Sequence, residues 1–225
     1  MVAVALSSRR WGSPGTLPPV LLVHATGETS ADWTRVATDL ARDRLVVAVD
    51  LRGHGASPRP GSYALTELAE DLEAVAAGLA AEHGRPADVV GHSLGGLVAC
   101  LLAARRADLV GRLVLEDVPV PHPREPRPPS RPDGDLDVDW DAVLEVRAQI
   151  DDPDPDWPRV VASVTAPTLV VWGGPESPMP PEHVAEMAAT VADGRLVRID
   201  AGHLVHARQP AAFTAAVRGF LAAAD

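Results

Sequence analysis

Six short apolar runs divide the chain into regular intervals. They cover residues 20–24, 45–50, 88–92, 112–117, 168–173 and 195–200. Most are apolar throughout instead of alternating with polar residues, which is typical of strands that are buried on both faces of a parallel sheet. The chain therefore predicts a parallel sheet covered on both sides.

The intervals between these runs carry apolar residues at helical spacing. Such stripes occur at 33–40, 65–79, 94–102, 184–191 and 213–221. Ser30 is a candidate N-cap for the first helix, and Pro180 and Pro181 stand where another helix would begin. Strands that alternate with helices predict an α/β fold with a doubly wound, mostly parallel sheet.

The alternation breaks once, between residues 118 and 166. This segment is rich in proline at first and then predicts one short helix near 141–150. We interpret 118–166 as a small lid inserted over the sheet, because long connections in compact domains often carry function. The 225 residues are enough for one sizeable core, so we expect a single domain over 1–225.

Composition excludes several classes of partner. The net charge of -11 and the pI of about 5.1 argue against nucleic acid and anionic membranes, because binding to phosphates needs clustered positive charge. The basic residues are all arginine, which excludes a catalytic lysine. A single cysteine, Cys100, and the lack of a secretory or membrane-spanning apolar run predict a cytoplasmic protein.

The stretch Gly91-His92-Ser93-Leu94-Gly95 is a G-x-S-x-G pentapeptide. A buried strand is predicted before it and an amphipathic helix after it, so a sharp turn would expose the Ser93 hydroxyl at the carboxyl edge of the sheet. The N-terminus of the following helix would also favour a developing oxyanion. Alone, the pattern also fits an ordinary strand-to-helix turn.

A histidine stands where such a serine would need a base. Serine is a poor nucleophile unless a base lies within hydrogen-bonding distance. His203 follows the last predicted strand, so its loop would lie over the same edge of the sheet as Ser93. His203 is therefore the preferred base.

With these parts in place, the sequence resembles the α/β-hydrolase family over nearly its whole length. Five segments match the family's motifs in order: VLLVHATG (20–27), DLRGHGAS (50–57), VVGHSLGG (89–96), APTLVVWGG (166–174) and AGHLVH (201–206). The resemblance implies a sheet of about eight strands, Ser93 as nucleophile, His203 as base and no metal or organic cofactor. His54 and His92 are expected to support loops, since neither has a metal-binding spacing.

The resemblance also implies an oxyanion hole made of backbone N–H groups. Leu94 and Thr26 match the family's donor positions. This chain has His24-Ala25 where the family usually has His-Gly, so the Ala25 N–H is a possible substitute.

The carboxylate that orients the histidine has two candidates. Glu176, three residues after Gly173, matches the family's usual position for the acid but is one methylene longer than aspartate. Asp117, at the end of the 112–117 run, matches relatives that place the acid on that strand. Its neighbour Glu116 is a third, weaker candidate.

These residues predict a serine hydrolase that acts on a small carboxylic ester, thioester or lactone, as a monomer or homodimer. Three other functions fit the same fold: a lyase or C–C bond hydrolase, a haloperoxidase-like enzyme and a non-catalytic binding module. Convergent arginines in the pocket would favour the lyase or C–C hydrolase. The lid arginines Arg124, Arg127 and Arg131 either meet an anionic substrate or face water.

Overall fold

A computed structural model describes residues 3–222 of the chain. Residues 1–2 and 223–225 of the expected 1–225 domain lie outside this range. The described part contains one sheet in the order β1-β3-β2-β4-β5-β6-β7. Its strands are β1 (Ser8–Trp11), β2 (Val20–Val23), β3 (Val46–Val49), β4 (Ala87–His92), β5 (Val110–Glu116), β6 (Thr168–Trp172) and β7 (Gly194–Arg198).

The prediction of a mostly parallel α/β sheet is confirmed, with seven strands in the described range in place of about eight. β1 pairs antiparallel with β3 at one edge, and the other strand pairs are parallel. The sequence pattern missed β1 because the strand reads Ser-Arg-Arg-Trp and its side chains are largely exposed. An edge strand needs no apolar run to pair through its backbone.

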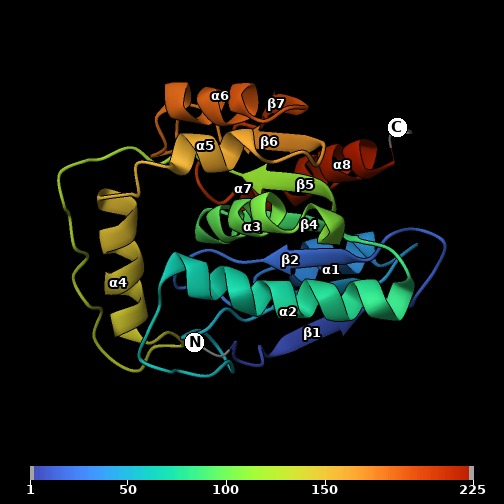
Figure 1. Ribbon diagram of the computed structural model, residues 1–225, viewed down its shortest axis with the longest axis horizontal. Helices are drawn as coiled ribbons and strands as arrows, with labels where there is room; N and C mark the ends of the chain where they lie inside the picture. Colours follow the sequence, from blue (N-terminus) through green and yellow to red (C-terminus); the bar gives the residue numbers. More distant parts are fainter. Residues whose placement is uncertain (1–2, 223–225) are drawn as a thin grey trace.

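Helices cover both faces of the sheet (Figure 1). Their bounds are α1 (Thr34–Leu40), α2 (Leu65–His83), α3 (Leu94–Arg105), α4 (Trp140–Asp151), α5 (Trp157–Ala162), α6 (Pro181–Thr190), α7 (Val205–Arg208) and α8 (Pro210–Leu221). One core cluster joins the sheet to α2, α3, α5 and α6, and a second joins its other face to α1 and α8. The sheet is therefore doubly wound, as predicted. No helix in residues 3–222 has the length and apolar character needed to cross a membrane.

The expected cap of the first helix is wrong. α1 begins after Trp33, and no side chain caps it. The backbone N–H of Ser30 instead donates to Asp50 Oδ1 at 2.7 Å. Ser30 thus ties the loop after β2 to the end of β3 and does not begin the helix.

The order of the strands reverses between β2 and β4. The chain leaves β2 for β3 on one side and then returns to β4 on the other. Val23 pairs with Gly91, so the loops that follow these two strands emerge side by side. Such a switch point opens a crevice beyond the carboxyl ends of the strands, where ligands bind in open α/β sheets.

The proline-rich segment 118–166 contains two helices. α4 crosses the space beyond the carboxyl ends of the strands (Figure 1). It is fastened to the body of the protein by hydrogen bonds from Tyr63 Oη to Asp139 (2.5 Å) and from the Leu65 N–H to Gln149 (2.9 Å). α5 instead packs on α3 and α6, with Trp157 and Val161 in the core. α4 matches the short helix predicted near 141–150.

Candidate active site

The serine of the pentapeptide stands on a sharp turn between β4 and α3. Its backbone has φ 49° and ψ -113°, a conformation that L-residues rarely adopt. A Cβ on Gly91 or Gly95 would overlap backbone atoms of Gly95 or Val23, respectively. The two glycines are therefore what allows Ser93 to reach this geometry at the mouth of the crevice.

The end of β5 supplies a carboxylate beside this turn. His92 pairs with Glu116 in the sheet, so Ser93 and Asp117 leave adjacent strands at the same level. Asp117 also has a positive φ, 53°; it and Ser93 are the two non-glycine residues with this feature in the described chain. Strained backbone of this kind persists where the surrounding structure holds it in place, which often happens at functional sites.

His203 binds this carboxylate. Its Nδ1–H donates to Asp117 Oδ2 at 2.7 Å. Asp117 is fully buried and also accepts hydrogen bonds from Ser177 Oγ (2.6 Å) and the Gly173 N–H (3.0 Å). Three donors therefore hold the carboxylate in one orientation. Ser177 carries no motif that singles it out in the sequence, although it stands directly after the candidate Glu176.

The other carboxylates considered from the sequence lie elsewhere. The side chain of Glu176 is 82% exposed and comes near Arg208, at 4.0 Å, but does not contact His203. Glu116 is fully buried and binds His206. The structure therefore brings Asp117 to His203 and brings neither Glu176 nor Glu116 there. The loop after β6 instead contributes the Gly173 N–H and the Ser177 hydroxyl to Asp117, while the Glu176 side chain points to solvent.

Two of the three candidate oxyanion donors are free to bind an oxyanion. Within residues 3–222, the backbone N–H groups of Thr26 and Leu94 donate no hydrogen bond. The Ala25 N–H donates to Glu28 Oε2 at 3.0 Å, so this group is already used. His24 fixes the start of the loop, because its Nδ1–H donates to the Ala25 carbonyl and its Nε2 accepts from the Leu51 N–H.

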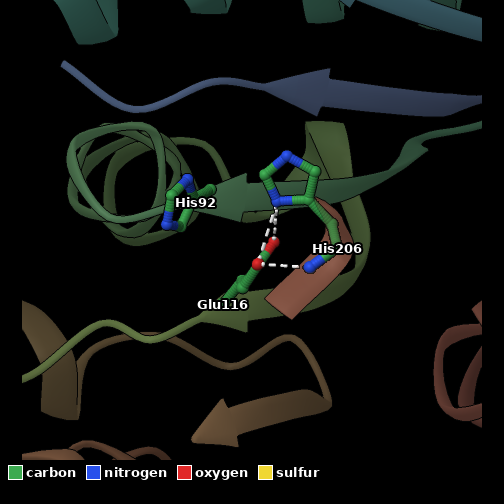
Figure 2. Close-up of side chains that lie close together, drawn as sticks. All are labelled: His92, Glu116 and His206. Atoms are coloured by element: carbon green, nitrogen blue, oxygen red, sulfur yellow. Dashed lines mark hydrogen bonds and ion pairs between the residues drawn. The ribbon is translucent and has the colours of Figure 1, made fainter. Parts of the chain in front are cut away.

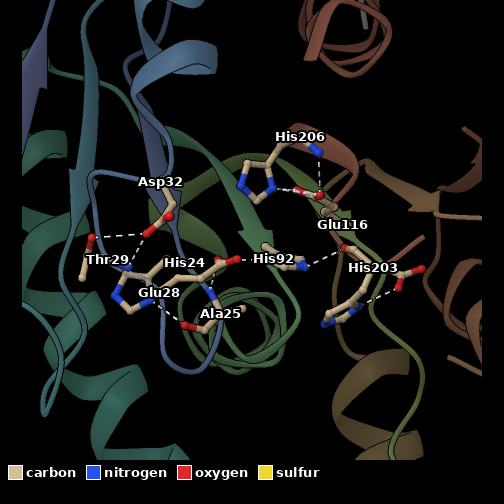
Figure 3. Close-up of polar contacts among 10 residues, drawn as sticks. His24, Ala25, Glu28, Thr29, Asp32, His92, Glu116, His203 and His206 are labelled. Atoms are coloured by element: carbon tan, nitrogen blue, oxygen red, sulfur yellow. Dashed lines mark hydrogen bonds and ion pairs between the residues drawn. The ribbon is translucent and has the colours of Figure 1, made fainter. Parts of the chain in front are cut away.

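A charged histidine lies beneath the site. Figure 3 shows His92 between the carboxylate of Glu28 (3.1 Å) and the backbone carbonyl of His203 (2.9 Å). Both partners are acceptors, so both contacts are satisfied only when the ring carries two N–H groups. Burial opposes this charge, but Glu116 and Glu28 outweigh it and raise the pKa of His92 to about 9. Burial also favours protonated Glu28, yet His92 lowers its pKa to about 2.

His92 also belongs to a compact buried cluster with Glu116 and His206 (Figure 2). Glu116 accepts from the backbone N–H of His206 at 2.8 Å and from its Nδ1 at 2.9 Å. The three side chains are close enough to hold a metal ion, but the doubly protonated ring of His92 has no lone pair to offer. In this cluster hydrogen bonds join Glu116 to His206, whereas His92 bonds to Glu28 and to the His203 carbonyl. Spacing along the chain gave no signal for it, because its members come from three separate elements.

A cavity of about 500 Å³ connects these parts. Ser93, His203, Thr26 and Glu28 line one part of it, and the lid segment lines another. Ser93 and His203 share the cavity without a hydrogen bond between their side chains. Serine–base contacts are often loose in ligand-free enzymes and tighten when substrate binds, so the shared cavity is compatible with proton transfer.

The fold agrees with comparisons to known proteins. The family model described as alpha/beta hydrolase fold matches residues 18–145. The sn-1-specific diacylglycerol lipase ABHD11 of Mus musculus is 27% identical over 92% of this chain and 82% of its own. An esterase of Mycobacterium tuberculosis is 44% identical over 52% of this chain, but the match spans only 37% of the esterase. A solved hydrolase from Pseudomonas aeruginosa superposes with a TM-score of 0.81, at 27% identity over 97% of this chain and 94% of its own.

The chain belongs to the α/β-hydrolase fold family, and it is an enzyme of that class. The resemblance seen in the sequence motifs is thereby confirmed.

Proposed function

We propose that the protein is a serine hydrolase that cleaves a small carboxylic ester, thioester or lactone through an acyl-enzyme intermediate. Ser93 is the nucleophile, His203 the general base and Asp117 the acid that orients it. The 2.7 Å contact between His203 Nδ1 and Asp117, in a cavity shared with Ser93, carries this proposal. The esterase and lipase names of the relatives support it.

The reaction begins with proton transfer from the Ser93 hydroxyl to His203 Nε2. The serine oxygen bonds to the carbonyl carbon, and the oxygen that becomes negative accepts from the N–H groups of Thr26 and Leu94. Preorganised donors of this kind stabilise the transition state by about 3 kcal/mol each. Asp117 stabilises the imidazolium and keeps Nε2 directed at the serine.

His203 then protonates the departing alcohol or thiol, and the acyl group stays on Ser93. Water enters, gives its proton to His203 and attacks the acyl carbon. Collapse of the second tetrahedral intermediate returns the proton to the Ser93 oxygen and releases the acid. The chain's own residues carry each of these steps.

Segment 118–166 includes the lid in this proposal. Residues 119–124 and α4 line the cavity that holds Ser93, whereas α5 packs against the core. The part that acts as a lid is therefore 118–151. A small acyl group would be enclosed between this part and the carboxyl ends of the strands.

A fluorophosphonate probe and a panel of short-chain esters test the proposal. Wild type is expected to label once and to hydrolyse the esters, whereas Ser93→Ala abolishes labelling and lowers turnover by several powers of ten. His203→Ala does the same with Ser93 intact. Wild type that neither labels nor turns over any ester would overturn the proposal and favour a lyase or binding role.

A further inference from the structure

Two arginines converge on the lid end of the cavity. Arg124, in the proline-rich segment, and Arg147, on α4, both line it. Asp151 joins them, because its carboxylate accepts from Arg124 Nε at 2.5 Å and from Arg147 Nε at 2.9 Å. The two guanidinium groups are therefore held side by side in the wall that faces the nucleophile's cavity.

The support for this pair is rigid. Asp151 is 2% exposed and also accepts from the Arg127 N–H at 3.0 Å, while its own carbonyl accepts from the Arg124 N–H at 2.9 Å. Burial favours protonated Asp151, but the Arg127 N–H and the two guanidinium groups lower its pKa to about 2. The arginines are thus preorganised, which reduces the entropy lost when they bind a ligand.

Each guanidinium has N–H donors that Asp151 does not use. Only the Nε atoms contact Asp151, and within residues 3–222 the terminal Nη atoms of Arg124 and Arg147 make no hydrogen bond. The two side chains are 42% and 35% exposed, so the free N–H groups are open to the cavity or solvent. A planar guanidinium with free Nη donors matches the oxygens of a carboxylate.

The two arginines and Asp151 form a group that carries one positive charge. Two arginines and one aspartate give a net +1, although the chain as a whole carries -11. Glu28, a carboxylate that lines the cavity, is compensated by the charged His92. The rings of His122 and His183 lie 4.2 Å apart at the lid end, where His122 binds Glu186 at 2.7 Å. A single positive charge suits a monoanion better than a phosphate dianion.

The cavity between the two ends is apolar. Leu97, Val143, Val146, Ile150 and Met179 line it. Its volume of about 500 Å³ lies in the range of pockets that bind small molecules. It therefore fits a short hydrocarbon segment that separates a reacting carbonyl from an anionic end.

We propose that Arg124 and Arg147 determine specificity by binding a carboxylate of the substrate, so that the enzyme acts on esters, thioesters or lactones with a carboxylate remote from the scissile bond. Convergent arginines also fit the lyase or C–C bond hydrolase considered from the sequence, and turnover of the esters below separates these reactions from ester hydrolysis. This inference rests on the proposed hydrolase function and names its substrate class. The anion is bound at the lid end while the carbonyl lies against Ser93.

The other lid arginines provide an internal control. The side chain of Arg127 is exposed and does not line the cavity, although its backbone N–H contacts Asp151. Arg131 lines a separate hollow together with Asp135, Asp139 and Asp141. Of the three arginines singled out in the sequence, only Arg124 is placed to meet a substrate. Arg147, which was not singled out, is its partner.

The test compares matched esters that differ only in charge. On the acyl side the pair is mono-p-nitrophenyl glutarate and p-nitrophenyl pentanoate; on the alcohol side it is 3-(butanoyloxy)propanoate and propyl butanoate, followed by pH-stat titration. Wild type is expected to favour the charged member of at least one pair by roughly tenfold or more in kcat/KM, through KM. Added salt lowers this preference, because the guanidinium groups are partly exposed.

Substitutions then locate the preference. Arg124→Gln and Arg147→Gln each lower kcat/KM for the charged ester by roughly tenfold and leave the neutral ester within about twofold. Arg127→Gln changes neither. Unchanged turnover of the neutral ester also shows that each variant is folded.

Two outcomes overturn the inference and leave the hydrolase function standing. In one, wild type hydrolyses the neutral esters and shows no preference for charge in either pair. In the other, the charged preference survives in the double variant Arg124→Gln/Arg147→Gln. Absence of both turnover and Ser93 labelling would instead be the failure of the proposed function.

Discussion

Two neighbouring carboxylates at the end of β5 each bind a histidine of segment 203–206, yet their surroundings differ. Glu116 and His206 are both buried, and the carboxylate accepts from the histidine's backbone as well as its ring. Asp117 is equally buried, but the side chain of His203 is 27% exposed and lines the cavity. β5 ends at Glu116 and Asp117 has a positive φ, so the chain turns between them; one pair lies in the core and the other lies beside the cavity.

The comparison shows that a histidine–carboxylate contact does not by itself define a catalytic pair. Access to the cavity and a partner serine at the neighbouring strand end distinguish the His203 pair. The His206 pair instead connects α7 to the sheet, and the ring of His206 stacks on Trp33 at 4.4 Å. We expect loss of the first pair to reduce turnover and loss of the second to reduce stability.

The largest effect is expected for Asp117→Asn. Asparagine tolerates the positive φ of this position but binds His203 in the wrong tautomer, so kcat should fall by roughly 10³ to 10⁴. Steady-state hydrolysis of a p-nitrophenyl ester measures this loss. Glu176→Gln is the matched control and should remain within about twofold of wild type, because its side chain is exposed. A large loss of kcat in Glu176→Gln instead would mean that Glu176 is the acid that orients His203.

Glu116→Gln is expected to act on stability. It leaves the buried His206 without its charged partner, which should lower the free energy of unfolding by on the order of 3 kcal/mol. Urea unfolding followed by circular dichroism measures the change. Turnover by the folded fraction should stay within several-fold of wild type, and a wild-type unfolding midpoint would contradict a structural role for this pair.

His92 connects the two pairs and should make stability depend on pH. Its ring lies 4.6 Å from that of His203 and 5.2 Å from that of His206, with Glu28 and Glu116 as its anionic neighbours. The pKa of His92 is raised in the folded state to about 9, so its stabilisation is full below about pH 6.5 and is lost as the pH rises through 9.

The free energy of unfolding of wild type, measured from pH 6 to 10, should therefore decline by on the order of 3 kcal/mol above pH 6.5. His92→Gln should be less stable at pH 6.5 and show a flatter profile. Equal slopes for the two proteins would mean that His92 is neutral in the fold.

The smallest effect is expected for Ser177→Ala. The substitution removes one of three donors to Asp117 and leaves the contact with His203 in place. One hydrogen bond to a charged group is worth about 1.5 kcal/mol or more when buried, and this one is partly exposed. We expect kcat/KM to fall by roughly three- to tenfold, and Ser177→Thr to recover most of it. If kcat/KM is the same as in wild type for both variants, Ser177 does not help to position Asp117.

Much of the fold could be predicted because the parallel strands and their helices carry strong apolar periodicity. The strand runs, both helical layers and α4 followed directly from this pattern. β1 could not be predicted, since an exposed edge strand needs only backbone pairing. The prediction that Ser30 caps α1 was wrong because the Ser30 N–H donates to Asp50, a contact between distant residues that the local sequence does not specify.

The candidate site likewise has residues that could be predicted from the sequence and residues that could not. Ser93 and His203 could be placed because a strand-to-helix turn and a loop after the last strand fix their position by local sequence. The choice between Asp117 and Glu176 depends on where two loops approach His203, which no pattern along the chain encodes. The same holds for Glu28, whose contact with His92 joins residues 64 apart, and for the arginine pair held by Asp151.

The rate at which a fluorophosphonate modifies Ser93 tests the central claim most directly, because it reports the serine–histidine–aspartate unit without a substrate preference. The measurement follows the adduct by intact-protein mass spectrometry and peptide mapping, under conditions where Asp117→Asn and Glu116→Gln are both folded. We expect modification at Ser93 that is roughly a hundredfold slower or more in Asp117→Asn and within several-fold of wild type in Glu116→Gln. An adduct on another residue, or Glu116→Gln slowed as strongly as Asp117→Asn, would contradict it.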